Sequence, residues 1–288
     1  MRGKEIMKVN VQYDFKTEKD IKREVQRFKR FLKKEEMSEN TILGYTWTVD
    51  YYLKNYGVIT TDSLLAYKGY LVAGYAPTTV NQRIQAINKY LRFVNYKYHL
   101  KSIKVQQKPF LENVISMQDY KYLKRRLKRE NQVFYFLVWG MASTGARVSE
   151  ALCIKAEHII DGQMDFYGKG KKYRRIYFVK AYQKECSEWL RKICKTSGYI
   201  FTKQNGELLS IKAVEKQLKH YARIYNLDPA VMYPHSFRHL YGKTFYEKEH
   251  DLPLLADLMG HASLDTTRIY SRRSSLEQQK IVNRIVTW

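Results

Sequence analysis

The sequence has few cysteines, few acidic residues and no long hydrophobic run, and each shortage excludes a class of protein. Its three cysteines, Cys153, Cys186 and Cys194, are odd in number and lack CxxC spacing. This pattern argues against a disulfide framework or a zinc site and favours a reducing compartment. The sequence also contains no internal repeat and no low-complexity tract.

The longest stretch without a charged residue, residues 131–146, is 16 residues long and includes Gly, Ser, Thr and Asn. It is short for a membrane span and predicts a buried helix instead. The N-terminus begins with basic residues but lacks the apolar segment of a secretory signal. We therefore expect a soluble, cytoplasmic protein with no membrane partner.

The shortage of acidic residues leaves a strongly basic chain, because 52 Lys and Arg stand against 28 Asp and Glu, a formal charge of +24. Such an excess attracts polyanions, so nucleic acid is the first partner to consider and an anionic membrane the second. Codon bias in an AT-rich genome is a third explanation, since it enriches Lys and also the 25 tyrosines. The 288 residues, 44% of them hydrophobic, suffice for one large globular domain or two ordinary ones.

Composition and periodicity divide the chain into four segments. These are an N-terminal tail (1–16), an all-helical domain (17–100), a basic and aperiodic linker (101–109) and a second domain (110–288). In the helical domain, apolar residues from 80 to 94 recur at spacings of four and three, which predicts an amphipathic helix. Thr78 or Thr79 is expected to cap this helix after Pro77. Its polar face, which begins at Asn81, is either an ordinary solvated face or a DNA contact.

The second domain mixes helical patterns with short β-type runs. Asp161-Gly162 is a strong hairpin signal between two such runs, and the Gly-Lys-Gly-Lys-Lys segment (168–172) separates the next pair. Residues 175–179 are expected to form a third strand. The predicted fold is therefore mainly α with a small antiparallel β-sheet, an all-α domain being followed by an α+β domain.

Arginine, histidine, lysine and tyrosine recur in a combination that suits cleavage of a phosphodiester without a metal. Planar guanidinium groups match the oxygens of a phosphorane with paired hydrogen bonds. The nucleophile needs a proton acceptor, and the leaving 5′-oxygen needs a proton donor. Four separated segments supply these groups, namely residues 144–150, 168–172, 235–239 and 258–270.

Each segment also has an ordinary structural explanation. Arg147 can form an internal ion pair with Glu150, three residues on. His235 begins an H-x3-H pair of the kind that binds zinc, but Arg238 shares its helical face and no carboxylate or cysteine ligand is near, so we expect no metal. Tyr270 is one of 25 tyrosines, and its phenol becomes a nucleophile only where nearby arginines and a lysine stabilise the phenolate.

Together these segments resemble the tyrosine recombinase (phage integrase) family, and within it the compact Xer-like members. Residues 144–150 (Thr-Gly-Ala-Arg-Val-Ser-Glu) are similar to the family's first arginine box, and residues 235–239 (His-Ser-Phe-Arg-His) are similar to its second. Leu-Met-Gly-His261, followed nine residues later by Tyr270, resembles its final box. The order and the spacing of the three boxes both agree with the family.

The resemblance extends upstream to residues 38–45 and 76–87, which are similar to two helices of the family's core-binding domain. It therefore covers the chain from about Thr17 to the end, and it implies two domains that form a clamp around double-stranded DNA. The residues expected to contact DNA are Thr41, Tyr45, Thr78, Thr79, Asn81, Arg83, Lys171 and Lys172.

The resemblance implies a catalytic role for several residues of the boxes. Tyr270 is the nucleophile, which forms a 3′-phosphotyrosyl bond and leaves a free 5′-hydroxyl. Arg147 and Arg238 clamp the scissile phosphate, and Glu150 orients the first arginine box. No ATP, cofactor or metal is implied, because the phosphotyrosyl bond conserves the energy of the bond that was broken.

Three further residues are implied to donate or accept protons. Lys169, the first lysine of the family's Gly-Lys-Gly pattern, is the general acid toward the leaving 5′-oxygen, and two more lysines share its turn. His235 accepts the tyrosine proton, and His261 donates a further hydrogen bond to the phosphate. After His239 the sequence Leu-Tyr-Gly-Lys departs from the family's small, hydroxyl-rich continuation, which concerns local packing more than catalysis.

The family resemblance also implies an assembly. Four subunits would act on two DNA duplexes and exchange strands through a Holliday junction, with a sister recombinase or an accessory DNA-bending protein as a further partner. The biological role is then either integration and excision of a mobile element or resolution of chromosome or plasmid dimers. The apolar residues of the tail (274–286) suit a helix that docks either on a neighbouring subunit or on its own core.

Three other functions fit the sequence less well. A type IB-like topoisomerase shares the same reactive residues but relaxes DNA as a monomer, and the Xer-like core-binding helices of this chain favour recombination. A catalytically silent DNA-binding regulator would have no need of the complete set of reactive residues. A metal-dependent relaxase is disfavoured because a His-hydrophobe-His motif is absent.

Overall fold

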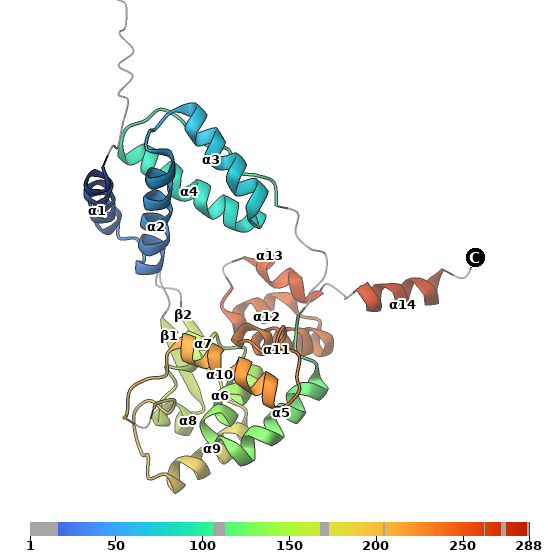
Figure 1. Ribbon diagram of the computed structural model, residues 1–288. Coiled ribbons are helices and arrows are strands. Elements are labelled where there is room, and N and C mark those ends of the chain that lie inside the picture. The colour runs from blue at the N-terminus through green and yellow to red at the C-terminus, as the bar shows by residue number, and fades with distance from the viewer. Residues whose placement is uncertain are drawn as a thin grey trace, which may run out of the picture. The chain divides into compact units, whose positions relative to one another are not determined.

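The structure of the protein is a computed structural model, which describes residues 17–105, 113–167, 173–203, 205–261, 263–271, 275–286 and 288. Its described residues form helices and one two-stranded antiparallel sheet (Figure 1), so the predicted mainly α fold with a small antiparallel sheet is confirmed. The chain divides into two compact units, Met1–Gln107 and Lys108–Trp288. Within the described ranges, no helix has both the length and the apolar character that crossing a membrane requires.

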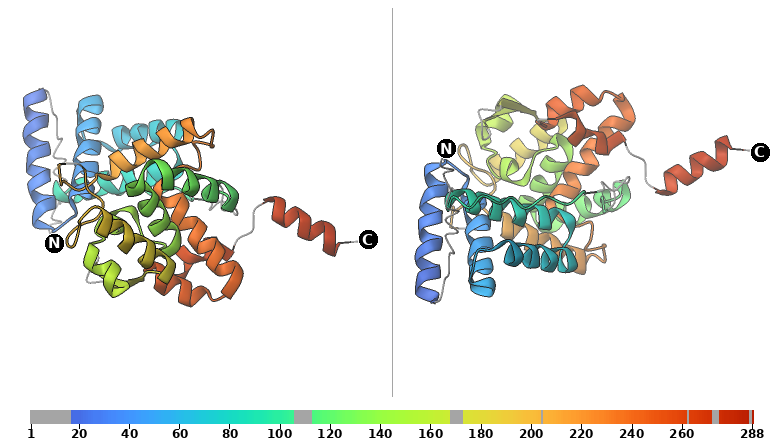
Figure 2. Two further views of the ribbon diagram at one scale, coloured as in Figure 1. Left: turned by 90° about the horizontal axis from the view of Figure 1, so that it is seen from below. Right: turned by 90° about the horizontal axis from the view of Figure 1, so that it is seen from above.

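The described part of the first unit is an assembly of helices, drawn in blue to teal in Figure 2. The helices are α1 (Glu18–Lys34), α2 (Glu39–Tyr56), α3 (Thr61–Gly74) and α4 (Pro77–Phe93). Their common core includes the fully buried rings of Tyr52, Tyr67 and Tyr90. Several of the abundant tyrosines therefore pack a core and are not available to bind a ligand.

Helix α4 starts differently from the prediction. Its first residue is Pro77, and its N-cap is Ala76, which makes no side-chain capping bond. Thr78 and Thr79 lie inside the first turn, so the expectation that one of them caps the helix was wrong. Proline suits the first helical position because its fixed φ is already helical and its missing N–H needs no partner there.

Two asparagine side chains of α4 hold the chain that follows this helix. The Asn88 amide donates to the carbonyl of Leu100 and accepts from its N–H, at 2.9 and 2.8 Å. Asn81 makes the same pair of bonds with Ile103, both at 2.9 Å. These bonds fix the first part of the predicted linker against α4, while residues 106–109 of that linker lie outside the described residues.

The second unit is organised around one buried helix, α6, against which α5, α9 and α11 pack. Residues 134–141 of α6 are all buried, which confirms the prediction of a buried helix from the uncharged stretch. The helices of this unit are α5 (Met117–Glu130), α6 (Gln132–Thr144), α7 (Val148–Ala151), α8 (Ala156–Asp161), α9 (Lys180–Lys192), α10 (Ile211–Ile224), α11 (Pro234–Glu249), α12 (Leu252–Met259), α13 (Leu264–Thr267), the 3-10 helix η1 (Arg268–Ser271) and α14 (Ser275–Ile285).

The sheet of the second unit consists of β1 (Gln163–Tyr167) and β2 (Tyr173–Tyr177), paired antiparallel. The expectation of a further strand before Asp161-Gly162 was wrong, because α8 occupies that position. Gly162, with φ 75°, ends α8 as its C-cap. A helix C-cap and a tight hairpin turn both favour glycine in the left-handed region, so the same dipeptide suits either structure. Lys169, Lys171 and Lys172, for which a turn was predicted, lie outside the described residues.

Candidate active site

Side chains from four separate stretches of the second unit meet at the carboxyl end of α6. Gly145, which follows α6, is left-handed with φ 64°, and an added Cβ there would lie 2.5 Å from the ring of Tyr241. The Gly145 carbonyl accepts a hydrogen bond from Arg238 and, at 3.4 Å, another from Arg174. The turn after α6 therefore depends on glycine and binds two arginines through one backbone oxygen.

Arg238, on α11, is 3% exposed, and backbone and side-chain groups hold it from several directions. Besides the Gly145 carbonyl, its Nη2 donates to the Met259 carbonyl at 2.7 Å and to His261 Nε2 at 2.8 Å. Burial, reinforced by the neighbouring arginines, lowers its pKa to about 10. The guanidinium is thus a cation at neutral pH in a largely desolvated position, where an anionic ligand would be strongly attracted.

Arg147 forms the predicted ion pair with Glu150 and is still accessible. Its Nη1 donates to Glu150 Oε1 at 2.7 Å, and the backbone N–H of Arg147 donates to Oε2 at 2.8 Å. Its Nη2 also donates to the Gly260 carbonyl at 3.2 Å. Because 39% of the Arg147 side chain remains exposed, the ion pair orients the guanidinium without hiding it from a ligand.

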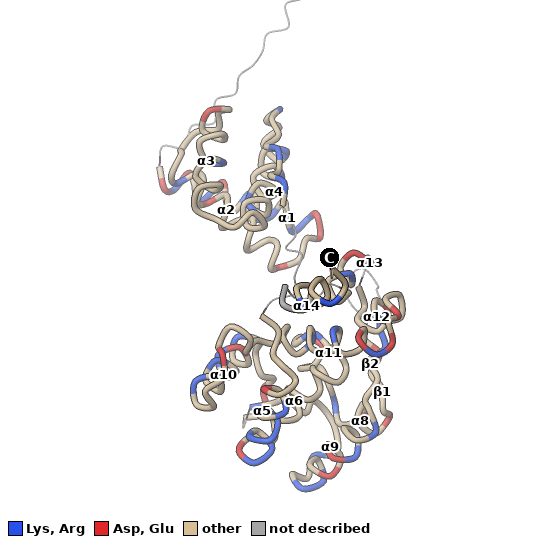
Figure 3. The backbone as a smooth tube through the Cα atoms, turned by 90° about the vertical axis from the view of Figure 1, so that its right-hand side faces the viewer, with Lys and Arg blue, Asp and Glu red and all other residues tan. Residues whose placement is uncertain are grey.

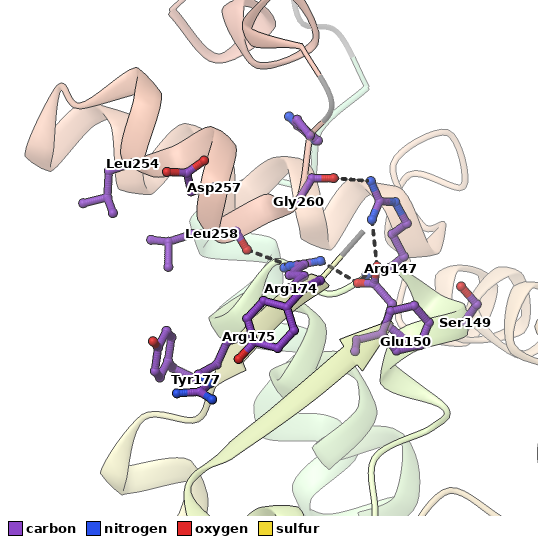
Figure 4. A pocket seen from close by; sticks show the side chains of 13 residues that line it. Arg147, Ser149, Glu150, Arg174, Arg175, Tyr177, Leu254, Asp257, Leu258 and Gly260 are labelled. Carbon is purple, nitrogen blue, oxygen red and sulfur yellow. Dashed lines mark hydrogen bonds and ion pairs between the residues drawn. The ribbon is translucent and has the colours of Figure 1, made fainter. Parts of the chain in front are cut away.

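Arg174, on β2, is a member of the site that sequence reasoning missed. It is 5% exposed and donates to Glu150 at 2.5 Å and to the Leu258 carbonyl at 2.8 Å. Arg174 and the buried Ile176 share one face of the strand, and this alternation could have identified it as an inward-facing charge. In Figure 4 the guanidinium groups of Arg147 and Arg174 are both directed at the Glu150 carboxylate.

A cleft of about 940 Å³ opens beside these arginines (Figure 4). Its wall comes from Arg147 and α7, from the sheet, and from α12 with the residues that follow it. The lining residues are Arg147, Ser149, Glu150, Phe166, Tyr173, Arg174, Arg175, Tyr177, Leu254, Asp257, Leu258, Gly260 and His261. The cleft thus borders the proposed phosphate-binding arginine Arg147, but Arg238 and Tyr270 are not part of its lining.

His261 has a defined protonation state in this arrangement. An arginine can only donate, so His261 Nε2 must be the acceptor of the bond from Arg238. The ring proton is then on Nδ1, which donates to Thr267 Oγ1 at 2.7 Å. To donate a hydrogen bond to a phosphate, as the resemblance implies, His261 Nε2 would first have to acquire a proton.

Tyr270, in η1, is buried next to its own chain's arginine and histidines. It is 4% exposed, its ring lies nearly parallel to that of His261, and its hydroxyl lies 3.1 Å from His239 Nδ1. Arg238 and Arg147 lower the pKa of Tyr270 as the sequence predicted, but burial outweighs them and raises it to about 12. The hydroxyl is therefore protonated at neutral pH and needs a base before it can attack.

The structure brings most of the predicted site residues together. Arg147, Arg238, His261 and Tyr270 are connected through the contacts described above. His235 lies at the exposed start of α11, with its ring centroid 6.2 Å from that of His239. Within the described ranges, no three His, Cys, Asp or Glu side chains lie together as metal ligands would.

The half-buried side chains of His239 and His261 should make the stability of the protein depend on pH. Burial, reinforced by nearby cations, lowers the pKa of His239 and of His261 from 6.5 to about 4. Between pH 6.5 and 4 the unfolded chain therefore binds protons that the folded chain does not, so stability falls as the pH falls through this window. We expect the melting temperature to drop between pH 7 and pH 5. A double His239→Gln, His261→Gln variant should show a flatter profile, and an equally steep one would refute this origin.

Gly242, on α11, provides the surface on which the Tyr270 ring lies. An added Cβ there would lie 2.5 Å from Tyr270 Cε1 and 2.6 Å from Cζ. Gly242→Ala is therefore expected to lower the free energy of unfolding by about 1–3 kcal/mol through overpacking. Gly69, in α3, has no atom within 4 Å of an added Cβ, so Gly69→Ala serves as a control that should stabilise the protein slightly. If the two changes altered the free energy of unfolding equally in chemical denaturation, the Tyr270 ring would not pack against Gly242 as described.

The candidate DNA-binding residues of the first unit differ in their exposure and in the contacts that they already make. Thr78 is exposed, and Thr41 shares a short hydrogen bond with the capping Ser38. Arg83 stacks its guanidinium against the rings of Trp47 and Tyr75, at 4.5 and 4.2 Å from their centroids. Tyr45 and Thr79 are half-buried. The Asn81 amide holds Ile103, so a DNA contact from it would have to replace those bonds.

Known proteins resemble the chain in both sequence and fold. A model of the phage integrase family matches residues 99–277. Tyrosine recombinase XerA of Pyrococcus furiosus is 29% identical over 277 residues, which cover 93% of this chain and 96% of that protein. XerH recombinase bound to its difH substrate has a TM-score of 0.69 at 18% identity, covering 94% of this chain and 99% of that one. A lambda integrase tetramer bound to a Holliday junction has a TM-score of 0.69 at 15% identity, covering 88% and 79%.

The family model spans more than half of the chain and includes all four converging stretches. The chain therefore belongs to the phage integrase family, and its likeness to Xer-type tyrosine recombinases runs along most of its length. Membership makes it an enzyme of site-specific DNA recombination. The predicted resemblance is confirmed.

Proposed function

We propose that the protein cuts and rejoins DNA through a 3′-phosphotyrosyl intermediate and exchanges strands through a Holliday junction. The observation that carries this proposal is the position of Tyr270, whose ring stacks on that of His261 and whose phenol lies within the electrostatic influence of Arg238 of the same chain. A nucleophile, a buried cation and a hydrogen-bonding histidine are the groups that a metal-free attack on a phosphodiester requires. Because these groups belong to one chain, the arrangement supports cleavage by each subunit in its own active site.

The arginines would bind the scissile phosphate before the reaction begins. Arg147 is held by Glu150 yet exposed, and Arg238 is held by carbonyls and desolvated, so both guanidinium groups are fixed in advance. Charge that develops on the non-bridging oxygens then meets oriented donors, which favours the transition state over the ground state. The Tyr270 oxygen attacks phosphorus, and the 5′-oxygen leaves with a proton, for which Lys169 is the proposed donor.

A bound phosphate would also change the protonation of His261. The pKa of His261 is lowered to about 4 by burial and by the neighbouring arginines. A phosphodiester anion between those arginines would offset their charge and favour the protonated imidazole. His261 could then donate through Nε2 to a non-bridging oxygen, which is the role that the resemblance implies.

The two units would close around duplex DNA as a clamp. Lys and Arg recur on α4 of the first unit and on α5 of the second (Figure 3), which suits contacts with backbone phosphates. We propose Thr41, Tyr45, Thr78, Thr79 and Arg83, with Lys171 and Lys172 of the predicted turn, as DNA contacts. Recombination would take place in a tetramer on two duplexes, and the exposed Val282 and Ile285 of α14 suit docking on a neighbouring subunit.

A direct test uses the full chain and duplex fragments from the DNA beside its own gene, in excess EDTA. We expect an adduct that survives SDS and migrates as protein joined to DNA, because no step requires a metal. An adduct that forms only with a divalent metal would favour a relaxase-type mechanism. Relaxation of plasmids that lack this DNA, at the same rate as plasmids that carry it, would favour a topoisomerase.

A further inference from the structure

The histidine that contacts the nucleophile is His239, which has no role in the mechanism above. Its Nδ1 lies 3.1 Å from the Tyr270 hydroxyl. His235, the proton acceptor that the family resemblance implies, makes no hydrogen bond with Tyr270 among the described residues. We propose that His239 is the catalytic residue that accepts the Tyr270 proton during strand cleavage, an inference that rests on the proposed function.

The packing of α11 directs the Tyr270 hydroxyl toward His239. His239 and Gly242 are three residues apart on this helix, so they share a face. The Tyr270 ring lies against Gly242, where no side chain intervenes, and its ring centroid is 5.8 Å from that of His239. The hydroxyl at the far end of the ring is thereby brought to the imidazole. The contact between Tyr270 and His239 thus depends on the missing side chain of Gly242. It is set by the packing of α11 and not only by the rotamer of Tyr270.

His239 is also in the protonation state that a base requires. Burial, and then the charges of His235 and Arg238, lower its pKa to about 4, so the imidazole is neutral at pH 7. With the ring proton on Nε2, Nδ1 can accept the hydrogen bond that the Tyr270 hydroxyl donates. The phenol cannot ionise unaided, because its pKa is raised to about 12.

Substrate binding would adjust this base to its task. In the free protein, Arg238 and His235 on α11 oppose a positive charge on His239, and Arg147 adds to the positive field at Tyr270. A phosphodiester bound to the arginines supplies a compensating negative charge, which increases as the phosphorane forms. Proton transfer to His239 therefore becomes favourable only when DNA is in the site.

The step conserves atoms and charge. The O–H bond of Tyr270 breaks and its proton moves to His239 Nδ1, while the tyrosine oxygen bonds to phosphorus. The bond from phosphorus to the 5′-oxygen breaks, and that oxygen takes a proton from the general acid. In rejoining, the 5′-hydroxyl returns its proton to the group that acted as general acid and attacks the phosphotyrosine, and His239 returns its proton to the departing tyrosine oxygen.

The test separates proton transfer from simple packing by changing the acidity of the nucleophile. His239→Gln is made in two backgrounds, with tyrosine at position 270 and with a fluorinated tyrosine whose phenol is more acidic. The rate of SDS-stable adduct formation is measured on duplex fragments from the DNA beside the gene. We expect a loss of about 100-fold with tyrosine, and a loss of less than about tenfold with the fluorinated residue, which needs less help from a base.

Controls test whether the His239 change disturbs folding or DNA binding. His220→Gln, on the exposed surface of α10, should leave the rate unchanged, and DNA binding and melting of the His239 variant should remain close to the parent values. An unchanged rate in His239→Gln, or an equal loss with both nucleophiles, would overturn the proposal, as would an acidity-dependent loss found only in His235→Gln. The proposed function would survive these results, whereas it would fail if the parent protein itself formed no adduct.

Discussion

Replacing Tyr270 with phenylalanine should abolish covalent protein–DNA adducts while leaving DNA binding nearly intact. The change removes one hydroxyl, the atom that attacks phosphorus, and keeps the ring that lies on Gly242. The variant loses the hydrogen bond to His239 but creates no cavity, so the fold should persist. Adducts would be counted after SDS denaturation, and binding would be measured by gel shift on the same fragments.

Tyr246→Phe provides the matched control for this experiment. Tyr246 belongs to the same small apolar cluster as Tyr270, on the neighbouring α11, but it is not part of the proposed catalytic set. It should form adducts at the parental rate. Adducts that persist in the Tyr270 variant would refute the assignment of the nucleophile, whatever the control does.

A second large effect is expected from Arg174→Gln. The Arg174 and Glu150 side chains are 4% and 3% exposed, and the change leaves Glu150 buried with only the half-exposed Arg147 as a cationic partner. Removing one member of a buried ion pair typically costs about 3–5 kcal/mol of unfolding free energy. Because the same arginine donates to the Leu258 carbonyl, the carboxyl end of α12 should loosen as well. Chemical denaturation measures the first effect, and hydrogen exchange at residues 258–261 measures the second.

Arg175, the next residue on β2, provides the control for the Arg174 change. Arg175 faces the other side of β2 and pairs with Asp165 at the exposed surface. Exposed pairs contribute little to stability, so Arg175→Gln should denature close to the parent protein. If both variants were equally stable, the buried network would not be the element that holds the site together.

Much of the fold could be predicted from local patterns. Ser38 caps α2 and Gly57 ends it in the left-handed conformation, and such ends can be read from local sequence because capping depends on residues within one turn. The Asp161-Gly162 signal failed for the same reason. Locally it fits a helix end and a hairpin equally, and only the packing of α8 against its neighbours decides between them.

The candidate site could be predicted only where family motifs mark it. Arg147, Arg238, His261 and Tyr270 fall in such motifs, and the structure brings them together. Arg174 could not be assigned in this way, because its partners Glu150 and Leu258 are 24 and 84 residues away in the chain. His239 was visible in the sequence, but its contact with the tyrosine depends on a docking surface that appears only once α11 and η1 are packed.

The bonds around Arg238 have a consequence for what could replace it. A guanidinium has five N–H groups. In the described structure three of its hydrogen bonds go to the Gly145 carbonyl, the Met259 carbonyl and His261, which leaves two N–H groups for a phosphate. A lysine ammonium has three in total, all on one nitrogen, so it could not make all three of these bonds and also donate to the ligand. The positive charge alone is therefore insufficient here, and the surplus of donors lets one side chain be anchored before DNA arrives and still bind it.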